Sequence, residues 1–429
     1  MTSVKELYKL FKQCSCVCTD SRKIIPDSFF IALRGDNFNA NQFAGQALES
    51  GCKYAVVDDE KYAPDKRCIL VGDTLKTLQE LASFHRAALK IPVIGITGTN
   101  GKTTTKELLT AVLLKKYKTA STQGNLNNHI GVPLTLLSIK DEEIAVVEMG
   151  ASHPGEIAML CKISQPGFGL ITNIGKAHLE GFGNLEGVVN TKKELYDWIR
   201  SINGKSFVCR DNSLLMEISE GTGKITYGVN PRSNCRGQIK ESDPLLKLIW
   251  HNDSQTVDIA TNLYGFFNFE NVMAAICIGN YFGVEEGKIK EAIENYFPSD
   301  NRSQVITTKK NIVIMDAYNA NPTSMDASIQ NFMQLNSEKK YAVVGDMLEL
   351  GNDSEKEHEK ILDLLNDADF EKVIVVGKVF YFLNRSEKFL AFKNSDDASD
   401  YLKNNKPSGY HFLIKGSRGI RLEKILEAL

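Results

Sequence analysis

Several features that would point to particular protein classes are missing from this sequence. No apolar run approaches the roughly 18 residues that a membrane-spanning helix needs. The opening residues, MTSVKELYKLFKQ, lack the apolar block of a signal peptide. Lys and Arg (51 together) nearly balance Asp and Glu (53), so the formal net charge of -2 provides no broad basic field for nucleic acid. We therefore expect a cytoplasmic protein with no membrane span and no nucleic-acid partner.

Cysteine is too scattered for a disulfide framework. The nine cysteines are an odd number spread over 429 residues, a pattern that suits reduced thiols. Cys14, Cys16 and Cys18 alternate in CSCVC, but C-x-C-x-C lacks the paired spacing of a zinc site. Because alternate residues of a strand share one face, we expect a strand here.

What remains is the composition of an ordinary globular protein. Hydrophobic residues make up 42% and charged residues 24% of the sequence. A length of 429 residues exceeds one typical core, and roughly two to four domains are expected. Short apolar segments alternate with helical stretches, which predicts an α/β fold.

The most informative stretch is residues 91–105, IPVIGITGTNGKTTT. A buried-strand pattern is followed by spaced glycines and then by a helical segment that Lys102, Thr103 and Thr104 open. A strand, a glycine turn and a helix N-terminus form a phosphate site, because backbone N–H groups and the helix dipole face the anion. Lys102 adds a cation, and Thr103 can place its hydroxyl on Mg²⁺. An ordinary glycine-rich turn is the alternative.

Polar residues follow the strands that come after this loop. IPVIGIT, EIAVVEMG, FGLITNIG and KSFVCRDN alternate with helices and predict a parallel sheet with the phosphate loop at its carboxyl edge. Glu148 ends the second segment, where it can bind magnesium directly or through water; a capping or solvated carboxylate is the alternative. His178 follows the third segment and is expected at the same edge, although a lone histidine is usually structural.

Other stretches of the middle segment are ambiguous from residue types alone. Residues 122–137, TQGNLNNHIGVPLTLL, suit a loop rather than a helix start, and this loop is compatible with a structural turn or a ligand site. Lys192 and Lys193 lie on an expected helix, where lysines are ordinary surface charge. Asn268 and Asn271, three apart, face one side of another helix.

The first 88 residues predict a small α/β unit. FFIAL and YAVVDD are expected strands, NQFAGQALESG is a helix that Gly51 ends, and residues 73–90 form a helix leading to the central strand. Ser21 and Arg22, in the triplet DSR, follow a strand and could hold a phosphate. A capped turn is the simpler interpretation of these residues alone.

The last 130 or so residues predict a second sheet-and-helix unit. NIVIMDAYNANP, KYAVVGDM, KVIVVG and YHFLIKG supply its strands, but G-x-G-x-x-G is absent, so a dinucleotide is not indicated. Arg302 precedes this unit and Asp316 ends its first strand, followed by Tyr318, Asn319 and Asn321. GDMLELG (345–351) and KGSR (415–418) could each be a simple turn.

Together these motifs resemble one family. TGTNGKTT, with Ile96 where the common P-loop has its first glycine, resembles the nucleotide loop of the Mur ligase superfamily, which makes amide bonds at the expense of ATP. DSR and the strands after it resemble the family's UDP-binding domain. AHLEGFG followed by K-x-E-L-Y resembles the segment that ends in a carbamylated lysine. DAYNANP-x-S, GDM-x-ELG and KGSR resemble the C-terminal domain of the branch that adds D-alanyl-D-alanine.

The sequence departs from the family pattern at three places. The family's F-D-G-H is Phe38, Asn39, Ala40 and Asn41 here, so the Asp and His that make the family's substrate contacts are replaced by two asparagines. The histidine of G-x-H-N-x-x-N is Phe267, so only the two asparagines carry over. The D-N-P-R of the sister ligase that adds the third residue is absent.

The resemblance implies three α/β domains and a monomer. They are a UDP-precursor-binding domain (1–90), a central P-loop ATPase domain with a mostly parallel sheet (91–298) and a Rossmann-like C-terminal ligase domain (299–429). The implied reaction joins D-alanyl-D-alanine to UDP-N-acetylmuramoyl-tripeptide through an acyl phosphate, with ATP becoming ADP and phosphate. That reaction belongs to peptidoglycan precursor synthesis, and so to cell-wall biogenesis, cell shape and cell division. A related amide ligase such as a folylpolyglutamate synthase, or a P-loop kinase or NTPase, is the alternative.

The resemblance also implies a role for each matching residue. The catalytic residues are Lys102, Glu148, His178 and Lys192. ATP is bound by Gly98, Thr99, Asn100, Gly101, Lys102, Thr103, Thr104, Asn268, Asn271, Arg302 and Asp316. The substrate is bound by Ser21, Arg22, Asn125, Asn319 and Asn321. Mg²⁺ is bound by Thr103 and Glu148 at one position and by His178 and carbamylated Lys192 at a second.

Overall fold

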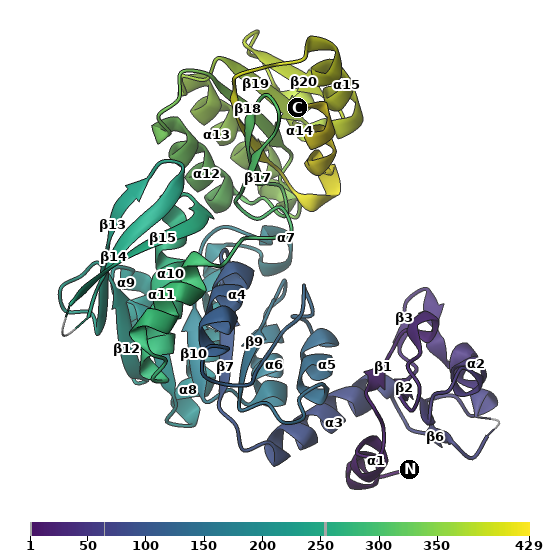
Figure 1. The fold of residues 1–429 in the computed structure, drawn as a ribbon. Coiled ribbons are helices and arrows are strands. Elements are labelled where there is room, and N and C mark those ends of the chain that lie inside the picture. Colours follow the sequence, from purple (N-terminus) through teal and green to yellow (C-terminus); the bar gives the residue numbers. More distant parts are fainter. Residues whose placement is uncertain (1, 64, 253–254) are drawn as a thin grey trace.

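The computed structural model describes residues 2–63, 65–252 and 255–429 and builds them around three large sheets (Figure 1). The first sheet is parallel, in the order β1-β2-β5-β6, with a two-stranded hairpin of β3 and β4 beside it. Its strands are β1 Val17–Cys18, β2 Phe29–Ile31, β3 Arg34–Gly35, β4 Phe38–Asn39, β5 Tyr54–Val57 and β6 Cys68–Leu70. Its helices are α1 Val4–Phe11, α2 Ala44–Glu49 and α3 Thr74–Ala88.

The second sheet has nine strands, in the order β15-β14-β13-β12-β11-β10-β7-β9-β8. In this order, each neighbouring pair between β13 and β8, including the two pairs that β7 makes, is parallel. The pairs β13–β14 and β14–β15 are antiparallel. Its strands are β7 Val93–Thr97, β8 Thr119–Ser121, β9 Ile144–Glu148, β10 Phe168–Ile171, β11 Lys205–Cys209, β12 Gly223–Gly228, β13 Cys235–Ser242, β14 Leu245–His251 and β15 Thr256–Tyr264. Its helices are α4 Lys102–Leu113, α5 Gly131–Leu137, α6 Glu156–Ser164, α7 Leu179–Phe182, α8 Leu185–Ser201, α9 Ser213–Ile218, α10 Phe269–Tyr281 and α11 Glu286–Glu294.

The third sheet has six strands, in the order β16-β17-β21-β18-β19-β20. Only the β16–β17 pair is antiparallel. Its strands are β16 Gln304–Thr307, β17 Ile312–Asp316, β18 Lys340–Gly345, β19 Lys372–Val376, β20 Phe389–Phe392 and β21 His411–Lys415. Its helices are α12 Pro322–Gln334, α13 Ser354–Asp367, α14 Lys378–Leu383 and α15 Ser395–Asn405. The predicted α/β architecture of three units and mostly parallel sheets is confirmed.

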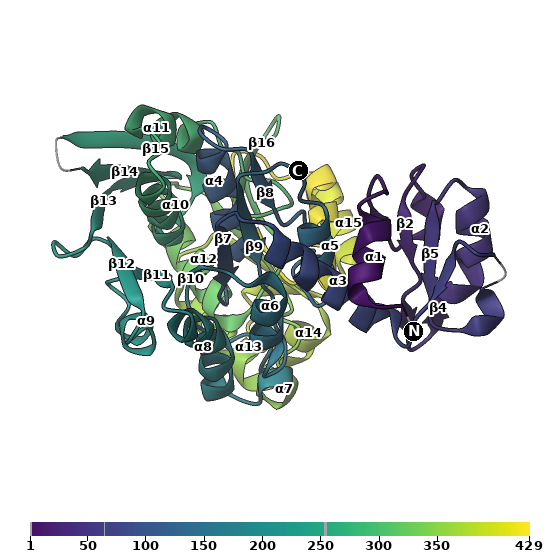
Figure 2. The ribbon, with the colours of Figure 1, turned by 90° about the horizontal axis from the view of Figure 1, so that it is seen from below.

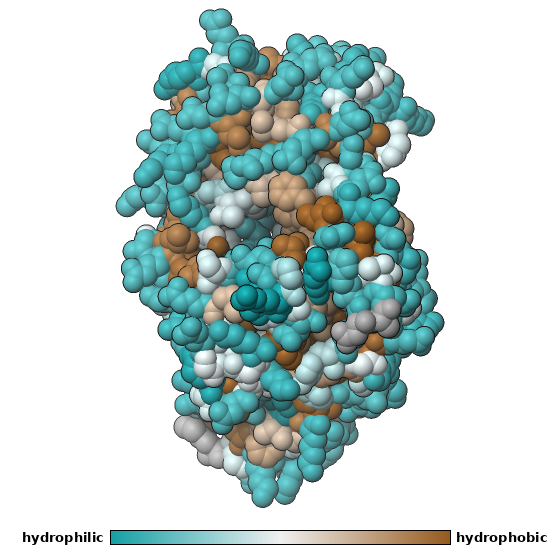
Figure 3. Space-filling model, turned by 90° about the vertical axis from the view of Figure 1, so that its left-hand side faces the viewer, coloured by the Kyte–Doolittle hydropathy of each residue, from teal (hydrophilic) through white to brown (hydrophobic). Residues whose placement is uncertain are grey.

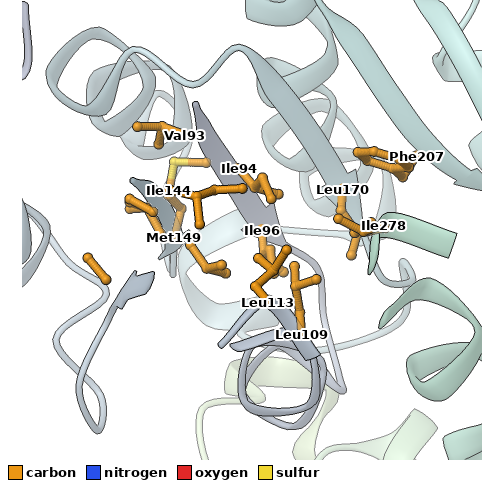
Figure 4. Close-up of a cluster of buried hydrophobic side chains, with 14 of the residues drawn as sticks. Val93, Ile94, Ile96, Leu109, Leu113, Ile144, Met149, Leu170, Phe207 and Ile278 are labelled. Atoms are coloured by element: carbon orange, nitrogen blue, oxygen red, sulfur yellow. The ribbon is translucent and has the colours of Figure 1, made fainter. Parts of the chain in front are cut away.

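The core of the second sheet explains why the phosphate loop lies where it does. Strand β7 is buried along its whole length, as expected of a central parallel strand covered on both faces. Its Ile94 and Ile96 lie beside Leu109 and Leu113 of α4, and β9 and β10 contribute further apolar side chains to the same cluster (Figure 4). This packing fixes the strand and the helix, and the loop between them is held at both ends.

The three units contact one another to different extents. The N-terminal elements stand to one side of the other two units (Figure 2). Helix α3 joins them to the rest, because it packs against α1 on one side and against α5 and α6 on the other. The second and third units share an apolar cluster that includes Leu179, Phe182 and Tyr264 from the middle segment and Ile314 and Met325 from the C-terminal one.

Two local expectations were wrong. Only Val17–Cys18 of CSCVC forms a strand, because Cys14 belongs to the turn that ends α1, where its N–H bonds the carbonyl of Phe11. Residues 122–137 contain the start of helix α5 as well as a loop. Asn128 accepts hydrogen bonds from the backbone N–H groups of Ile130 and Gly131 and so supports that helix start.

In the described part of the chain, no helix combines the length and the apolar character that crossing a membrane requires. Hydrophilic side chains cover most of the face drawn in Figure 3, and apolar ones gather around a hollow at mid-height.

Candidate active site

A cavity of about 840 Å³ lies between the second and third units. The phosphate loop and Glu148 line it from the second sheet, and Asp316 and Lys415 line it from the ends of β17 and β21. Parallel sheets bind ligands at the carboxyl ends of their strands, and here two such edges face one cavity. The cavity is within the range of about 300–1,000 Å³ that ligand pockets usually have.

The phosphate loop has the geometry that its glycines predict. Gly98 has a φ of 147° and Gly101 a φ of 77°, which L-residues with side chains rarely adopt. A Cβ at Gly98 would lie 2.0 Å from Thr172 Oγ1, and one at Gly101 would lie 2.4 Å from Asn271 Oδ1. The loop is pinned further by Thr99, whose N–H bonds the Asn173 carbonyl at 2.9 Å. The backbone is therefore preorganised around the N-terminus of α4.

Lys102 curls back over this loop. Its Nζ donates to the carbonyls of Gly98 at 2.7 Å and Thr99 at 2.9 Å. Burial lowers the pKa of Lys102, the Glu148 carboxylate opposes that shift, and the Arg302 cation adds to it. A half-buried ammonium whose described hydrogen-bond partners are two carbonyls has a donor left for an anion, which suits a phosphate ligand.

Glu148 has one occupied and one unoccupied carboxylate oxygen. Its Oε1 accepts hydrogen bonds from Thr103 Oγ1 at 3.3 Å and Asn127 Nδ2 at 2.8 Å. Its Oε2 is buried and has no hydrogen-bond partner among the described residues. An orphaned carboxylate oxygen beside a hydroxyl, at the N-terminus of α4, fits a hard cation such as Mg²⁺. Nowhere in the described residues do three or more His, Cys, Asp or Glu side chains group as metal ligands.

His178 and Lys192 approach the same aromatic ring from different elements. The His178 ring lies edge-on to Phe182, with centroids 6.3 Å apart, and Lys192 Nζ lies 5.6 Å from the centre of the Phe182 ring. His178 lines the cavity and pairs with Glu349 of the third unit at 2.5 Å. This pairing lowers the pKa of Glu349 against the opposing effect of its burial. Within the described structure, no hydrogen bond or ion pair joins His178 to Lys192.

Lys192 is buried on α8, although residue type alone suggested a surface position. Burial, with the Lys102 cation as a second cause, lowers its pKa to about 7. Glu156 and Glu194 oppose that shift. Unlike His178, Lys192 is not one of the described residues that line the cavity.

Asn268 and Asn271 lie together, as their spacing predicts. Asn271 donates to Asn268 Oδ1 at 2.9 Å and accepts from Thr105 Oγ1 at 3.0 Å, while Asn268 donates to the Tyr264 carbonyl. Both line the cavity beside Gly101. The pair thus connects α10 to the phosphate loop.

The third unit brings Arg302 and Asp316 to the cavity. The Arg302 guanidinium lies 3.4 Å from the centre of the Tyr318 ring, and its Nε is buried without a hydrogen-bond partner in the described residues. Asp316 pairs at 2.7 Å with Lys415, a lysine that is almost fully buried. One side chain from each of two strand ends is thereby fixed at the cavity.

The remaining expected residues of this region differ in exposure and in hydrogen bonding. Asn125 and Asn319 are exposed and line the cavity. Asn321 is occupied: its Oδ1 accepts from the Ser324 N–H at the start of α12, and its Nδ2 donates to Asn100 Oδ1 at 2.8 Å. Asn321 therefore also joins the third unit to the phosphate loop.

Ser21 and Arg22 are not brought to this cavity. They lie in the N-terminal unit, in a turn where Asp20 accepts from the Arg22 backbone N–H and pairs with its exposed guanidinium at 2.9 Å. Asn41, at the position of the family's histidine, is fully buried and donates to Asp58 at 2.7 Å. Its side chain supports the fold of this unit.

Sequence reasoning missed two residues of the site. Asn127 holds Glu148, but nothing distinguishes it from the neighbouring asparagines of residues 122–137. Lys415 was part of a recognised motif, KGSR, without an assigned role, and its position as the last residue of a buried strand was an available signal.

The site agrees with comparisons to known proteins. The family model described as Mur ligase middle domain matches residues 96–279, and the one described as Mur ligase, glutamate ligase domain matches residues 301–418. The UDP-N-acetylmuramoyl-tripeptide–D-alanyl-D-alanine ligase of Bacillus subtilis is 36% identical over 428 residues, which covers 96% of this chain and 92% of that protein.

Solved structures give the same result. MurF from Acinetobacter baumannii superposes with a TM-score of 0.88 at 30% identity, covering 99% of this chain and 98% of that one. MurF from Thermotoga maritima in complex with ADP gives 0.86 at 28% identity, covering 98% and 97%. A folylpolyglutamate synthase from Thermotoga maritima gives 0.61 at 14% identity, covering 82% and 92%, which indicates a shared fold alone. The chain belongs to the Mur ligases, and within them to the UDP-N-acetylmuramoyl-tripeptide–D-alanyl-D-alanine ligases.

Proposed function

We propose that this protein joins D-alanyl-D-alanine to UDP-N-acetylmuramoyl-tripeptide, with ATP becoming ADP and phosphate. The observation that carries the proposal is the single cavity where the phosphate loop, the half-free carboxylate of Glu148 and the C-terminal groups Arg302 and Asp316 meet. A nucleotide phosphate, a cation and a second substrate can be held together there. The relatives' names supply the identity of the substrates.

The reaction needs two transfers, because a carboxylate is a poor electrophile. The tripeptide carboxylate oxygen attacks the γ-phosphorus of ATP, the bond to the bridging oxygen breaks, and ADP leaves an acyl phosphate behind. The neutral amine of the dipeptide then attacks the acyl carbon and forms the amide. The bond to phosphate breaks, phosphate leaves, and the nitrogen gives its proton to solvent.

The residues of the chain bind and orient the reacting groups. Lys102 and the backbone N–H groups at the start of α4 stabilise the negative charge that moves toward the bridging oxygen. Asn268 and Asn271 keep the loop and α10 in register on the nucleotide side. Arg302 and Asp316 hold the nucleotide from the third unit, and closure of that unit excludes water from the acyl phosphate.

We assign magnesium to side chains in and beside this cavity. Thr103 and Glu148 would hold one ion, and the orphaned Glu148 Oε2 is the observation that supports this assignment. His178 and Lys192 would hold a second. Bound magnesium would neutralise phosphate charge and polarise phosphoryl oxygens.

Lys192 serves as an oxygen ligand only after carbamylation. The neutral amine attacks CO₂, a C–N bond forms and the nitrogen loses a proton, which leaves a carbamate anion. Burial favours the neutral amine, since it lowers the Lys192 pKa to about 7. A carbamate supplies the hard oxygen donors that Mg²⁺ prefers.

We assign residues 1–90 to the UDP end of the substrate, 91–298 to ATP and 299–429 to ligation, in a monomer. The exposed Arg22 guanidinium supports the first assignment. Helix α3 packs against α1 of the first unit and against α5 and α6 of the second, which supports a division between these units near the C-terminal end of α3. Asn125, Asn319 and Asn321 would contact the peptide.

The decisive experiment measures ADP release with UDP-N-acetylmuramoyl-tripeptide, with and without D-alanyl-D-alanine. We expect release that depends on both, with the pentapeptide as the product. Release without either substrate would indicate a simple NTPase. Release with a folate and glutamate instead would indicate a folylpolyglutamate synthase.

A further inference from the structure

A carboxylate of the third unit contacts His178 at the edge of the main cavity. Glu349 Oε2 lies 2.5 Å from His178 Nδ1, although the two residues belong to different units. His178 lines the cavity, whereas Glu349 is not among the described residues that line it. Glu349 therefore holds the ring without itself facing the cavity. In the part of the chain that the structure describes, no residue bonds the other ring nitrogen, Nε2.

Both residues of this pair have a backbone conformation that side chains rarely adopt. His178 has a φ of 51° and Glu349 a φ of 63°, in the left-handed region that favours glycine. Such positions cost free energy, persist only where the surrounding structure holds them, and gather at functional sites. An ordinary ion pair on a protein surface contributes little and does not require strained backbone at both ends. The pair is therefore more than a chance contact between two surfaces.

The loop that carries Glu349 is fixed within the third unit. The Met347 N–H donates to His358 Nε2 at 3.0 Å, and the Leu348 N–H donates to Ser417 Oγ at 3.0 Å. Met347 also belongs to the apolar cluster that the second and third units share. The carboxylate of Glu349 is thus presented from a rigid base, which reduces the entropy lost when it holds a partner.

The segment that carries His178 docks on the same loop. The Glu180 N–H donates to the Glu349 carbonyl at 3.4 Å, and a Cβ added at Gly351 would lie 3.3 Å from the Glu180 Cα. Phe182 lies edge-on to the His178 ring and belongs to the apolar cluster between the units. The imidazole is therefore held by a carboxylate at Nδ1 and by an aromatic ring, so its orientation is set by the protein alone.

We propose that Glu349 is a positioning residue that orients His178 for the second metal ion. The proposal rests on the proposed function, since it deepens the assignment of His178 as a ligand. An acceptor at Nδ1 keeps the proton of a neutral imidazole on that nitrogen and leaves the Nε2 lone pair for a metal. Metal-binding histidines commonly donate their second ring N–H to a carboxylate in this way. Because the third unit supplies Glu349, docking of that unit completes the second metal position.

The test measures Mn²⁺ binding to the whole chain by electron paramagnetic resonance, in the presence of a non-hydrolysable ATP analogue. The wild-type protein should bind two ions, and His178→Ala should lose the second. Glu349→Ala should weaken binding of the second ion by about tenfold to a hundredfold and leave the first unchanged. Glu349→Gln should retain most of the affinity, because its amide oxygen still accepts from Nδ1.

Glu180→Ala is the matched control, because Glu180 is exposed, lies two residues after His178 and is not among the described residues that line the cavity. This variant removes the same charge from the same neighbourhood and should bind both ions as the wild type does. The double variant with His178→Ala and Glu349→Ala should bind Mn²⁺ no more weakly than His178→Ala alone, since Glu349 acts only through the ring.

The proposal is overturned if Glu349→Ala binds the second ion as tightly as the wild type does. It is also overturned if Glu349→Gln loses as much affinity as Glu349→Ala, because Glu349 would then be a ligand itself. Failure of the proposed function has a different signature: the wild-type and His178→Ala proteins would bind the same number of ions, or the wild-type enzyme would release no ADP with both substrates present.

Discussion

At the residue scale, Glu148 gives the clearest link between geometry and chemistry. Thr103 and Asn127 both donate to Oε1, so the carboxylate cannot rotate freely, and Oε2 is left pointing at no described donor. Burial would make a free carboxylate oxygen costly in the absence of a cation. If a cation binds Oε2 as proposed, phosphate and cation together would stabilise the folded site, because both bind the folded state alone.

Lys102→Ala should abolish most of the activity. The substitution removes the cation that faces the developing phosphoryl charge, and we expect a loss on the order of 10²-fold or more in the rate of ADP release. Lys116→Ala is the control, because Lys116 lies just beyond the other end of α4, donates to the carbonyls of Phe282 and Gly283, and is not among the described residues that line the cavity. A folded Lys102→Ala protein that turns over at a nearly normal rate would rule out this role.

Lys192→Ala should be nearly inactive yet folded, because it removes a proposed metal ligand. Acetate or another short carboxylate should restore part of the activity by occupying the oxygen position of the missing carbamate. Lys193→Ala is the adjacent control and should have a mild effect, since Lys193 is partly exposed. The measurement is ADP release by both variants with and without added carboxylate. If Lys193→Ala were inactive and Lys192→Ala active, the assignment would be off by one residue, and two active variants would eliminate the carbamate.

At the element scale, strands and the phosphate loop could be predicted from the sequence, whereas several contacts could not. Apolar runs such as those of β7, β9 and β18 are buried on both faces, so their hydrophobicity alone identifies them. The start of α5 was missed because the same asparagines serve loops and helix caps. The burial of Lys192 could not be predicted for a similar reason. The residue type is the same for a buried and an exposed lysine of a helix, and only the packing of the neighbouring helices distinguishes the two.

A pH effect should originate at the junction of α1, α3 and the second unit. His85 is buried there, with Nε2 2.9 Å from the Ile139 carbonyl and Nδ1 3.2 Å from Tyr8 Oη, and burial lowers its pKa below 6.5. As the pH falls through 6.5, His85 of the unfolded chain binds a proton, whereas His85 of the folded protein stays neutral. The stability that the neutral ring contributes is complete above pH 6.5 and is lost as the pH falls through the lowered pKa.

The measurement is the Tm at pH 7.5 and at pH 5.5. His85→Gln should be less stable than the wild type at pH 7.5 but should lose less on acidification, because glutamine does not titrate. His153→Gln, at an exposed position, should keep the wild-type pH dependence. An unchanged pH dependence in His85→Gln would assign the effect to another group.

At the scale of the whole molecule, one segment connects the phosphate loop to the third unit. Asn173 accepts a hydrogen bond from the Asn100 N–H of the loop. Three residues later, Lys176 pairs at 2.7 Å with Glu357, a buried residue of α13 that also pairs with Lys360. Asn100 and Asn321, 221 residues apart, make a second connection. No local pattern predicts which residues meet over such separations, so the motifs could be read from the sequence while the cavity between them required the structure.

The last prediction concerns the N-terminal unit. This unit lies to the side of the other two units (Figure 2), and Arg22 is exposed on it. If this unit binds the UDP end of the substrate, Arg22→Ala should raise the KM for the UDP-precursor and leave the KM for ATP nearly unchanged. Steady-state ADP release with each substrate varied in turn measures both values.

Arg67→Ala is a close match for Arg22→Ala, since Arg67 is also exposed, lies in the same unit and pairs with an aspartate two residues before it, at 2.7 Å. An exposed pair of this kind contributes little to stability, so both variants should fold normally. Only the Arg22 variant should lose affinity for the precursor. Equal losses in the two variants, or equal losses for both substrates, would mean that the exposed guanidinium of Arg22 does not contact the UDP group.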